Sequence, residues 1–217
     1  MACVVPPIFD RNAVAGLDVS RETFERLLDY SQEVQKWSRT INLVSRSTHD
    51  DLWRRHILDS AQLFDIPKDP VSGWCDLGSG AGLPGMVVAI LARELRPETT
   101  HSLIESDTRK AAFLKLQAER LGLRVSIVTD RIEAAPPQNA DVVSARALAP
   151  LATLLRLAER HSRPGATLVF PKGKTYGQEL AGAEAQWRFD VVLKPSISNS
   201  EGKILVVTNL EAMEPSR

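Results

Sequence analysis

A short apolar segment that leads into four glycines within eight residues constrains the fold of this chain more than any other feature. Residues 74–77 read Trp-Cys-Asp-Leu, and Gly-Ser-Gly-Ala-Gly-Leu-Pro-Gly follows at 78–85. Glycines permit a sharp turn and let a ligand approach bare backbone. The segment therefore predicts a strand, a turn and a helix over 85–95, with a ligand site outside the carboxyl end of the strand.

The chain after this turn alternates between strand and helix patterns. Further strands are expected at 101–105, 124–129, 141–145, 166–171, 191–194 and 204–208. Helices are expected at 107–121, ended by Gly122, and at 150–161. Such alternation predicts an α/β fold with a doubly wound, mostly parallel seven-stranded sheet, whose last two strands are antiparallel neighbours.

The first 70 residues have a different, helical character. One helix is expected to begin after Ser20, and a second near Ser47 or Thr48 is expected to continue to Pro67. We therefore expect two parts: an N-terminal helical extension over 1–70 and a ligand-binding sheet domain over 71–217.

Composition excludes several classes of protein. The chain has 27 basic and 27 acidic residues, which argues against a non-specific nucleic-acid coat but leaves room for a local basic patch. Its two cysteines lack metal-ligand spacing, so we expect no metal site and a reducing compartment. No targeting or membrane-spanning segment is evident, and we expect a cytoplasmic protein.

Three kinds of cofactor compete for the glycine-rich turn. A P-loop requires Lys followed by Ser or Thr after the last glycine, and none follows Gly85. The tripeptide Gly173-Lys174-Thr175 lacks the earlier glycine, because position 168 is Leu168. A dinucleotide site fits better: residues 80–85 match G-x-G-x-x-G, with Glu105 at the spacing of a ribose-binding acid.

Asp76, two residues before Gly78, favours the third cofactor. Acid followed by G-x-G-x-G resembles motif I of class I methyltransferases, which have a Rossmann-like sheet. A carboxylate here can order the loop or meet a cationic group, but it would repel a pyrophosphate. S-adenosylmethionine carries an ammonium and a sulfonium and no phosphate, so it suits this site. Glu105 can accept both ribose hydroxyls. A purely structural turn capped by Asp76 is the remaining alternative.

Two later loops supply further candidates for the cofactor site. Ile132 and Glu133 follow the third strand, where a loop could close over an adenine. Arg146 follows the fourth strand, at the edge where reacting groups gather. The cofactor-binding residues expected from the sequence are Asp76, Gly78, Gly80, Leu83, Glu105, Ile132, Glu133 and Arg146.

Together these motifs make the chain similar to the RsmG (GidB) family of bacterial small-subunit rRNA methyltransferases. The similarity extends from about Lys36 to Lys174. The segments that carry it are Lys-Trp-Ser-Arg-Thr-Ile-Asn-Leu (36–43), Arg-His-Ile-Leu-Asp-Ser (55–60), the turn (76–85), Arg-Ala-Leu-Ala (146–149) and Pro-Lys-Gly (171–173). The family usually has Asp where Glu105 stands.

The resemblance implies methylation of the position-seven ring nitrogen of one guanine (nucleotide 527, in the 530 loop) of 16S rRNA. The expected partner is 16S rRNA within the small ribosomal subunit or an assembly intermediate. The expected RNA-binding residues are mainly basic: Lys36, Arg39, Asn42, Arg54, Arg55, His56, Lys172 and Lys174. That nitrogen has a free lone pair and no proton, so we expect no general base and name no catalytic residue. A small-molecule methyltransferase, an NAD-dependent oxidoreductase and a non-catalytic binding module are the alternatives.

Overall fold

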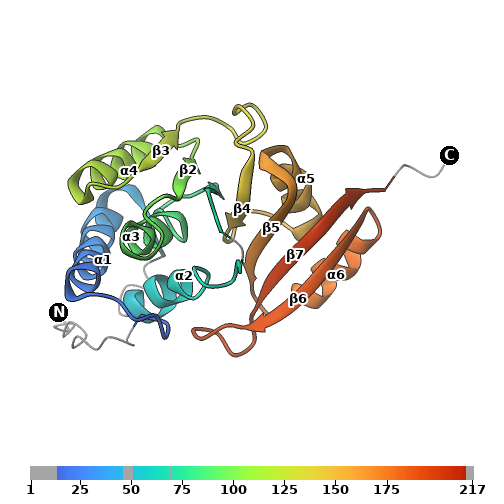
Figure 1. The fold of residues 1–217 in the computed structure, drawn as a ribbon, viewed down its shortest axis with the longest axis horizontal. Coiled ribbons are helices and arrows are strands. Elements are labelled where there is room, and N and C mark those ends of the chain that lie inside the picture. The colour runs from blue at the N-terminus through green and yellow to red at the C-terminus, as the bar shows by residue number, and fades with distance from the viewer. Residues whose placement is uncertain (1–13, 46–50, 69, 214–217) are drawn as a thin grey trace.

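Seven strands form one sheet in the order β3-β2-β1-β4-β5-β7-β6 (Figure 1). The computed structural model describes residues 14–45, 51–68 and 70–213. The strands are β1 (Gly73–Leu77), β2 (Thr100–Ile104), β3 (Val125–Val128), β4 (Ala140–Ala145), β5 (Ser162–Lys172), β6 (Trp187–Pro195) and β7 (Lys203–Ala212). Strands β1 to β5 are parallel, whereas β7 pairs antiparallel with both β5 and β6. The expected α/β fold class is confirmed.

The register of the central strands determines which loops meet. Leu77, the last residue of β1, pairs with Ile104 at the end of β2 and with Ala145 at the end of β4. The residues that follow all three strands therefore emerge at the same edge of the sheet. Glu105 and Arg146 come directly after β2 and β4, so both lie beside the glycine-rich turn.

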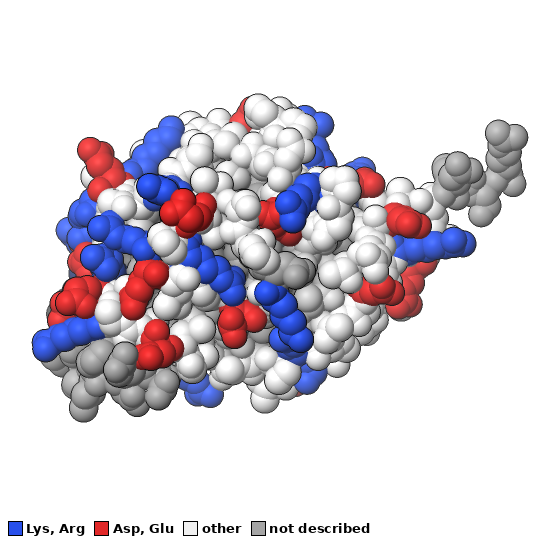
Figure 2. Space-filling view, in the orientation of Figure 1, with Lys and Arg blue, Asp and Glu red and all other residues white. Residues whose placement is uncertain are grey.

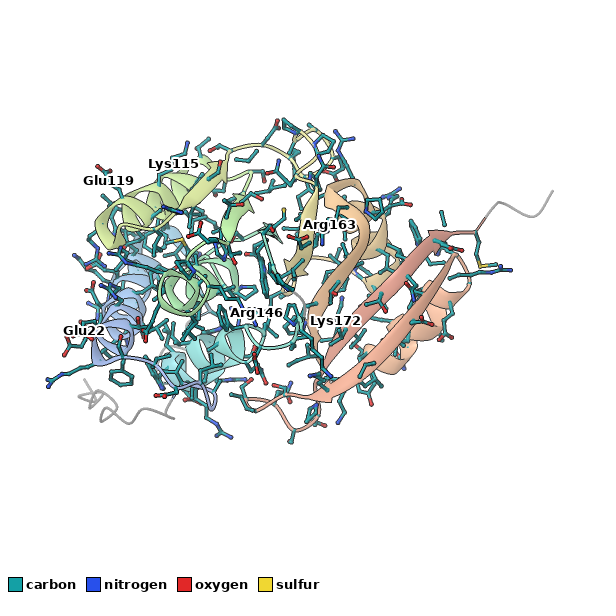
Figure 3. The ribbon with its side chains drawn as sticks, in the orientation of Figure 1. Glu22, Lys115, Glu119, Arg146, Arg163 and Lys172 are labelled. Carbon is teal, nitrogen blue, oxygen red and sulfur yellow. The ribbon has the colours of Figure 1, made fainter. Side chains whose placement is uncertain are left out.

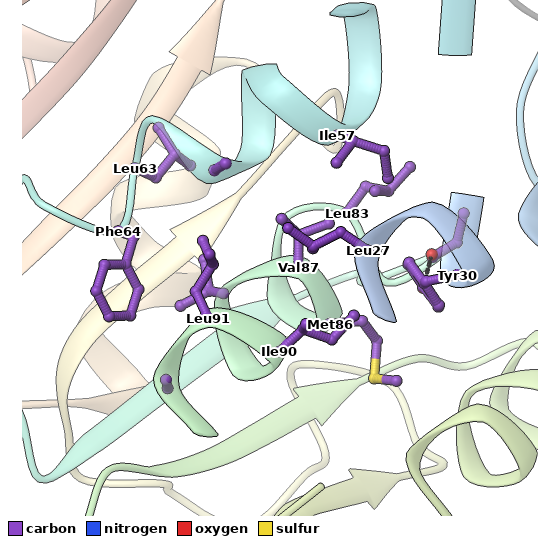
Figure 4. Packing of buried hydrophobic residues seen from close by; sticks show 14 of the residues in the cluster. Leu27, Tyr30, Ile57, Leu63, Phe64, Leu83, Met86, Val87, Ile90 and Leu91 are labelled. Atoms are coloured by element: carbon purple, nitrogen blue, oxygen red, sulfur yellow. Dashed lines mark hydrogen bonds between the residues drawn. The ribbon is translucent and has the colours of Figure 1, made fainter. Parts of the chain in front are cut away.

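Helices cover both faces of the sheet. They are α1 (Arg21–Ile41), the π-helical turn η2 (Trp53–Leu58), α2 (Asp59–Ala61), α3 (Gly85–Leu95), α4 (Thr108–Leu121), α5 (Leu151–His161) and α6 (Tyr176–Glu184). On one face, α1, η2, α2, α3 and α4 form a single hydrophobic cluster with alternate residues of the strands (Figure 4). On the other face, α5 and α6 pack on the residues in between. Trp74 and Cys75 illustrate the alternation, since each belongs to a different cluster.

Local sequence signals fix several helix ends. The side chain of Ser20 accepts a hydrogen bond from the Thr23 amide, as expected of an N-cap residue. Asp107 caps α4 in the same way through the amides of Arg109 and Lys110. Gly122 ends α4 in the left-handed conformation, with φ of 60°, as its position after the helical pattern predicts.

The structure corrects three expectations about elements. The second N-terminal helix does not continue to Pro67: α2 ends at Ala61 and turns follow. Its expected start near Ser47 or Thr48 lies outside the described residues. Helix α6 was not expected, because a segment with two glycines and no strong apolar spacing gives little helical signal. The last three strands are longer than expected, since their polar outer residues hide the extent of pairing.

Among the described residues, no helix is long and apolar enough to cross a membrane. Within the same part of the chain, no three His, Cys, Asp or Glu side chains gather as a metal site would require.

Candidate functional site

The carboxylate of Asp76 organises the glycine-rich turn from beneath. Its side chain is fully buried in β1. One carboxylate oxygen accepts hydrogen bonds from the Ser79 hydroxyl and from the Gly85 amide, the latter at 3.2 Å. The other accepts from the Ser144 hydroxyl at 2.7 Å. Burial raises the pKa of Asp76 to about 6, while these hydrogen bonds and the charge of Arg146 act in the opposite direction.

Helix α1 supports the same turn from its other side. The buried Tyr30 hydroxyl donates a hydrogen bond to the carbonyl of Ala81. Gly82 has φ of +70°, and a Cβ there would collide with the Tyr30 hydroxyl and with Met86. Only glycine can therefore occupy this position without displacing α1 or α3. The turn is fixed by contacts from the N-terminal helix as well as from the sheet.

A cavity of about 740 Å³ opens at the carboxyl edge of the sheet, above this turn. Its walls come from the turn, the η2–α2 segment, the ends of β4 and β5, and the connection between β6 and β7, together with Leu43 after α1 and Glu179 of α6. The lining residues that the sequence predicted are Arg55, His56, Gly78, Gly80, Leu83, Arg146 and Lys172. Cofactor and RNA candidates from distant parts of the sequence thus share one cavity.

Arg146 lies where these walls meet. Its Nη1 donates to Nδ1 of His56 at 2.9 Å and lies 3.7 Å from Oδ2 of Asp59. It also donates to the carbonyl of Arg55 at 3.4 Å. Burial lowers the pKa of Arg146, and the nearby carboxylates of Asp59 and Asp76 counteract that effect. Asp59 stands four residues after Arg55, but its ion pair is with Arg146.

Lys172 is held at the end of β5 by a second ion pair. Its Nζ donates to Oε2 of Glu179 and to the carbonyl of Ala149, both at 2.7 Å. The same Glu179 oxygen accepts from the Leu151 amide at 3.0 Å. Figure 3 shows Lys172 and Arg146 close to each other in the middle of the molecule, between the η2–α2 segment and the end of β5. Of the cations that line the cavity, Arg146 and Lys172 are thus each paired with a carboxylate.

Glu105 contacts the turn without lining the cavity. Its Oε2 accepts from the Gly80 amide at 2.8 Å, and its Oε1 accepts from the Asp107 amide at 2.7 Å. Oε2 lies beside the backbone of Gly80, which borders the cavity, whereas Asp107 lies outside the cavity wall. Glu105 and Asp76 therefore brace the turn from two directions.

The remaining predicted cofactor residues lie farther from the cavity. Asp76 is sealed beneath the turn. Ile132 is buried, and its carbonyl accepts from the ring Nε2 of His161 at 2.9 Å; Glu133 is exposed next to it. Neither residue after β3 contributes to the cavity wall. A cofactor that reached them would have to extend past Glu105 toward β3.

The predicted RNA-binding residues divide into two groups. Arg55, His56 and Lys172 line the cavity, as described above. The others are exposed and lie outside its wall: Lys36, Arg39, Asn42, Arg54 and Lys174. On the face seen in Figure 2, basic and acidic side chains are interspersed. Trp37 and Trp53 are half-buried and pack against Phe113 and Phe24.

Sequence reasoning missed the wall formed between β6 and β7. Its lining residues are Ser196, Ser198, Asn199, Glu201 and Lys203. A segment rich in Ser and Asn resembles an ordinary surface loop. Asp59 was within a recognised motif, but its role became visible only through its contacts with this loop and with Arg146.

Comparisons with known proteins agree with this geometry. Residues 23–207 match the family described as rRNA small subunit methyltransferase G. The chain belongs to that family. A relative from Ruegeria sp. (strain TM1040) is 49% identical over 195 residues, which are 90% of this chain and 95% of the relative. One from Rhodospirillum centenum is 47% identical over 196 residues, 90% of this chain and 88% of the relative. Both are named Ribosomal RNA small subunit methyltransferase G.

Solved structures confirm the methyltransferase fold. An S-adenosylmethionine-dependent methyltransferase from Aquifex aeolicus matches with a TM-score of 0.55 and 14% identity, over 82% of this chain and 98% of the other. An O-methyltransferase from Bacillus cereus, in complex with SAH, matches with a TM-score of 0.53 and 17% identity, over 83% of this chain and 91% of the other. At these identities the similarity establishes the fold, which is the class I methyltransferase fold expected from the sequence.

Proposed function

We propose that this chain transfers the methyl group of S-adenosylmethionine to the position-seven nitrogen of one guanine in 16S rRNA, nucleotide 527 in the 530 loop. The observation that carries the proposal is the cavity at the carboxyl edge of a methyltransferase sheet, which joins the glycine-rich turn to a polar region beyond β4 and β5. Membership of an rRNA methyltransferase family supports the choice of substrate.

The cofactor would lie along the turn. The backbone of Gly78 and Gly80 and the side chain of Leu83 border that part of the cavity. Glu105 would exchange its present amide partners for ribose hydroxyls, since a carboxylate can accept two such bonds. Arg146, neutralised by Asp59, would border the methionine end without adding a net positive charge beside the sulfonium.

The reaction requires alignment more than proton transfer. The in-plane lone pair of the guanine nitrogen attacks the methyl carbon, and the carbon–sulfur bond electrons return to sulfur. The products are the neutral thioether and a positively charged 7-methylguanine, and no proton is released. Catalysis would come from holding nitrogen, carbon and sulfur in line, with nearby carbonyl and carboxylate oxygens stabilising the positive charge on the base.

Two measurements test the proposal. Titration calorimetry compares the binding of S-adenosylmethionine with the binding of NADH. Binding of NADH alone would reject the proposal that S-adenosylmethionine is the cofactor. Mapping of 7-methylguanosine in 16S rRNA then compares a strain that lacks the gene with the same strain carrying it on a plasmid. We expect the modification at nucleotide 527 to be absent from the strain that lacks the gene and present in the strain that carries it on a plasmid. A fully modified nucleotide 527 in the deletion strain would reject the substrate.

A further inference from the structure

The connection between β6 and β7, residues 196–202, forms a wall of the cavity that has no assigned role. Together with Lys203, the first residue of β7, it contributes hydroxyl, amide, carboxylate and ammonium groups to the lining. It lies beside Lys172 at the end of β5, beyond the part of the cavity bordered by the glycine-rich turn. A base presented to a cofactor on the turn would meet this wall.

The loop is held in one position by the N-terminal part of the chain. Oδ1 of Asp59 accepts hydrogen bonds from the hydroxyls of Ser196, at 3.1 Å, and of Ser198. The amide of Ile197 donates to Oε1 of Gln62 at 3.0 Å. These contacts fix the loop to the same helical segment that carries the partner of Arg146. The wall is therefore preorganised, as a recognition surface needs to be.

Contacts within the loop also fix the position of Glu201. Its amide donates to Oδ1 of Asn199 at 3.1 Å. A Cβ on the following Gly202 would lie 2.7 Å from the carbonyl of Lys172, so glycine lets the loop pack directly on the end of β5. The backbone on both sides of Glu201 is thus constrained, while its side chain is exposed.

Three carboxylates line the cavity, and they differ in what they bind. Asp59 accepts from Gln62 and two serine hydroxyls and pairs with Arg146. Glu179 accepts from Lys172 and from a backbone amide. Among the described residues, no hydrogen bond or ion pair engages the carboxylate of Glu201. Both of its oxygens remain available to a ligand.

The four Lys and Arg side chains that line the cavity show the same contrast, and Arg55, like Lys203, has no carboxylate within ion-pair distance among the described residues. Arg146 and Lys172 are each paired with a carboxylate, as described above. Lys203 also lines the cavity, and within the described part of the chain its ammonium has no carboxylate within ion-pair distance. It lies two residues after Glu201, so one short segment offers an acceptor pair and a donor.

We propose that Glu201 and Lys203 recognise the Watson–Crick edge of the guanine to be methylated. This inference rests on the function proposed above. Guanine presents two adjacent donors, N1–H and the N2 amino group, which match the two oxygens of a carboxylate, and next to them the O6 acceptor, which matches an ammonium. Adenine presents an acceptor at N1 and a donor at N6, so the same pair would reject it. The position-seven nitrogen lies on a different edge and stays free to face the methyl group.

The experiment combines a side-chain change with a change of base. Glu201→Gln keeps the shape but replaces one acceptor oxygen by a donor. Inosine lacks the N2 amino group of guanine and keeps N1–H, O6 and the reacting nitrogen. Small subunits reconstituted on ligated 16S rRNA with guanine or inosine at the target are methylated by each variant, and kcat/KM is measured. Glu211→Gln, exposed at the far end of β7, is the matched control.

For the wild-type chain we expect inosine to lower kcat/KM by about 10- to 100-fold, because one charge-assisted hydrogen bond is lost. We expect Glu201→Gln to lower kcat/KM on guanine by about as much. In that variant, kcat/KM on inosine should be lower than on guanine by only about threefold or less. Calorimetric affinity for S-adenosylmethionine should stay at the wild-type value, which also reports that the variant is folded.

Any of three kinetic results would overturn the inference: wild-type activity of Glu201→Gln on guanine, an unchanged loss of kcat/KM on inosine in that variant, or a matching loss of activity in Glu211→Gln. Loss of cofactor affinity in Glu201→Gln would also do so, since the residue would then act on the turn. If the wild-type chain methylates neither substrate, the proposed function itself fails.

Discussion

Replacing Asp76 by Asn should remove a large pH dependence from the stability of this protein. Burial raises the pKa of the folded carboxyl from 3.8 to about 6, although Ser79, Ser144 and Gly85 donate to it. The unfolded chain titrates near the lower value. A group with a raised folded pKa stabilises the fold fully below the unfolded pKa, and this contribution is lost as the pH rises through the folded pKa.

The magnitude follows from the two pKa values. One pKa unit corresponds to about 1.4 kcal/mol, so the wild-type chain should lose about 3 kcal/mol relative to the non-titrating variant between about pH 4 and pH 7. Urea unfolding of both proteins at constant ionic strength measures the difference, in which other carboxylates cancel. Asp51→Asn, at an exposed position, is the control and should change the free energy of unfolding by under about 0.5 kcal/mol.

A difference between wild type and Asp76→Asn that is constant across this range would refute the reasoning. It would mean that the three hydrogen bonds hold the carboxylate charged as readily in the fold as in water. The turn would then be organised by a permanent anion rather than by a group that titrates near neutral pH.

Three further perturbations have definite expected outcomes. Gly82→Ala should lower the free energy of unfolding in urea by about 2–4 kcal/mol and weaken calorimetric binding of S-adenosylmethionine, because its Cβ collides with Tyr30. The control is Gly165→Ala, at a residue with a similar φ of +77° where a Cβ would meet no atom within 4 Å. It should lower the free energy of unfolding by at most about half as much. Tyr30→Phe should cost about 1–2 kcal/mol in the same unfolding assay, since a buried carbonyl loses its donor; no change would mean that water replaces the hydroxyl. Lys172→Met should destabilise the fold by about 3–5 kcal/mol, because Glu179 loses its ion-pair partner. Adding Glu179→Leu to Lys172→Met should recover most of that loss. A double variant no more stable than Lys172→Met would contradict this prediction.

The sequence predicted best the features that depend on neighbouring residues. Ser20 and Gly122 act on amides and carbonyls within a few positions, so their capping roles could be recognised without the fold. The glycine-rich turn is likewise a local pattern, and the central parallel strands follow from the alternation of strand and helix patterns along the chain. The edge at which Glu105 and Arg146 meet followed from the general rule for parallel sheets.

The parts that could not be predicted depend on contacts between distant segments. Asp59 binds Ser196 and Ser198, 137 and 139 positions away, and no local pattern encodes such a pairing. The π-helical turn before Asp59 departs from ordinary α-helical geometry, so helical spacing alone does not predict the ion pair of Asp59 with Arg146. Glu201 belongs to a loop whose composition carries no signal, and only its place in the cavity distinguishes it.

The hydrogen bonds from Ser196 and Ser198 to Asp59 join two segments that are far apart in the order of synthesis. The cofactor turn and its supports from α1 and β4 are complete once synthesis has passed Arg146. The wall at 196–202 is synthesised some fifty residues later, so its hydrogen bonds to Asp59 can form only then. A chain that ends before Ser196 therefore contains every residue of the glycine-rich turn but lacks the surface proposed to choose the base.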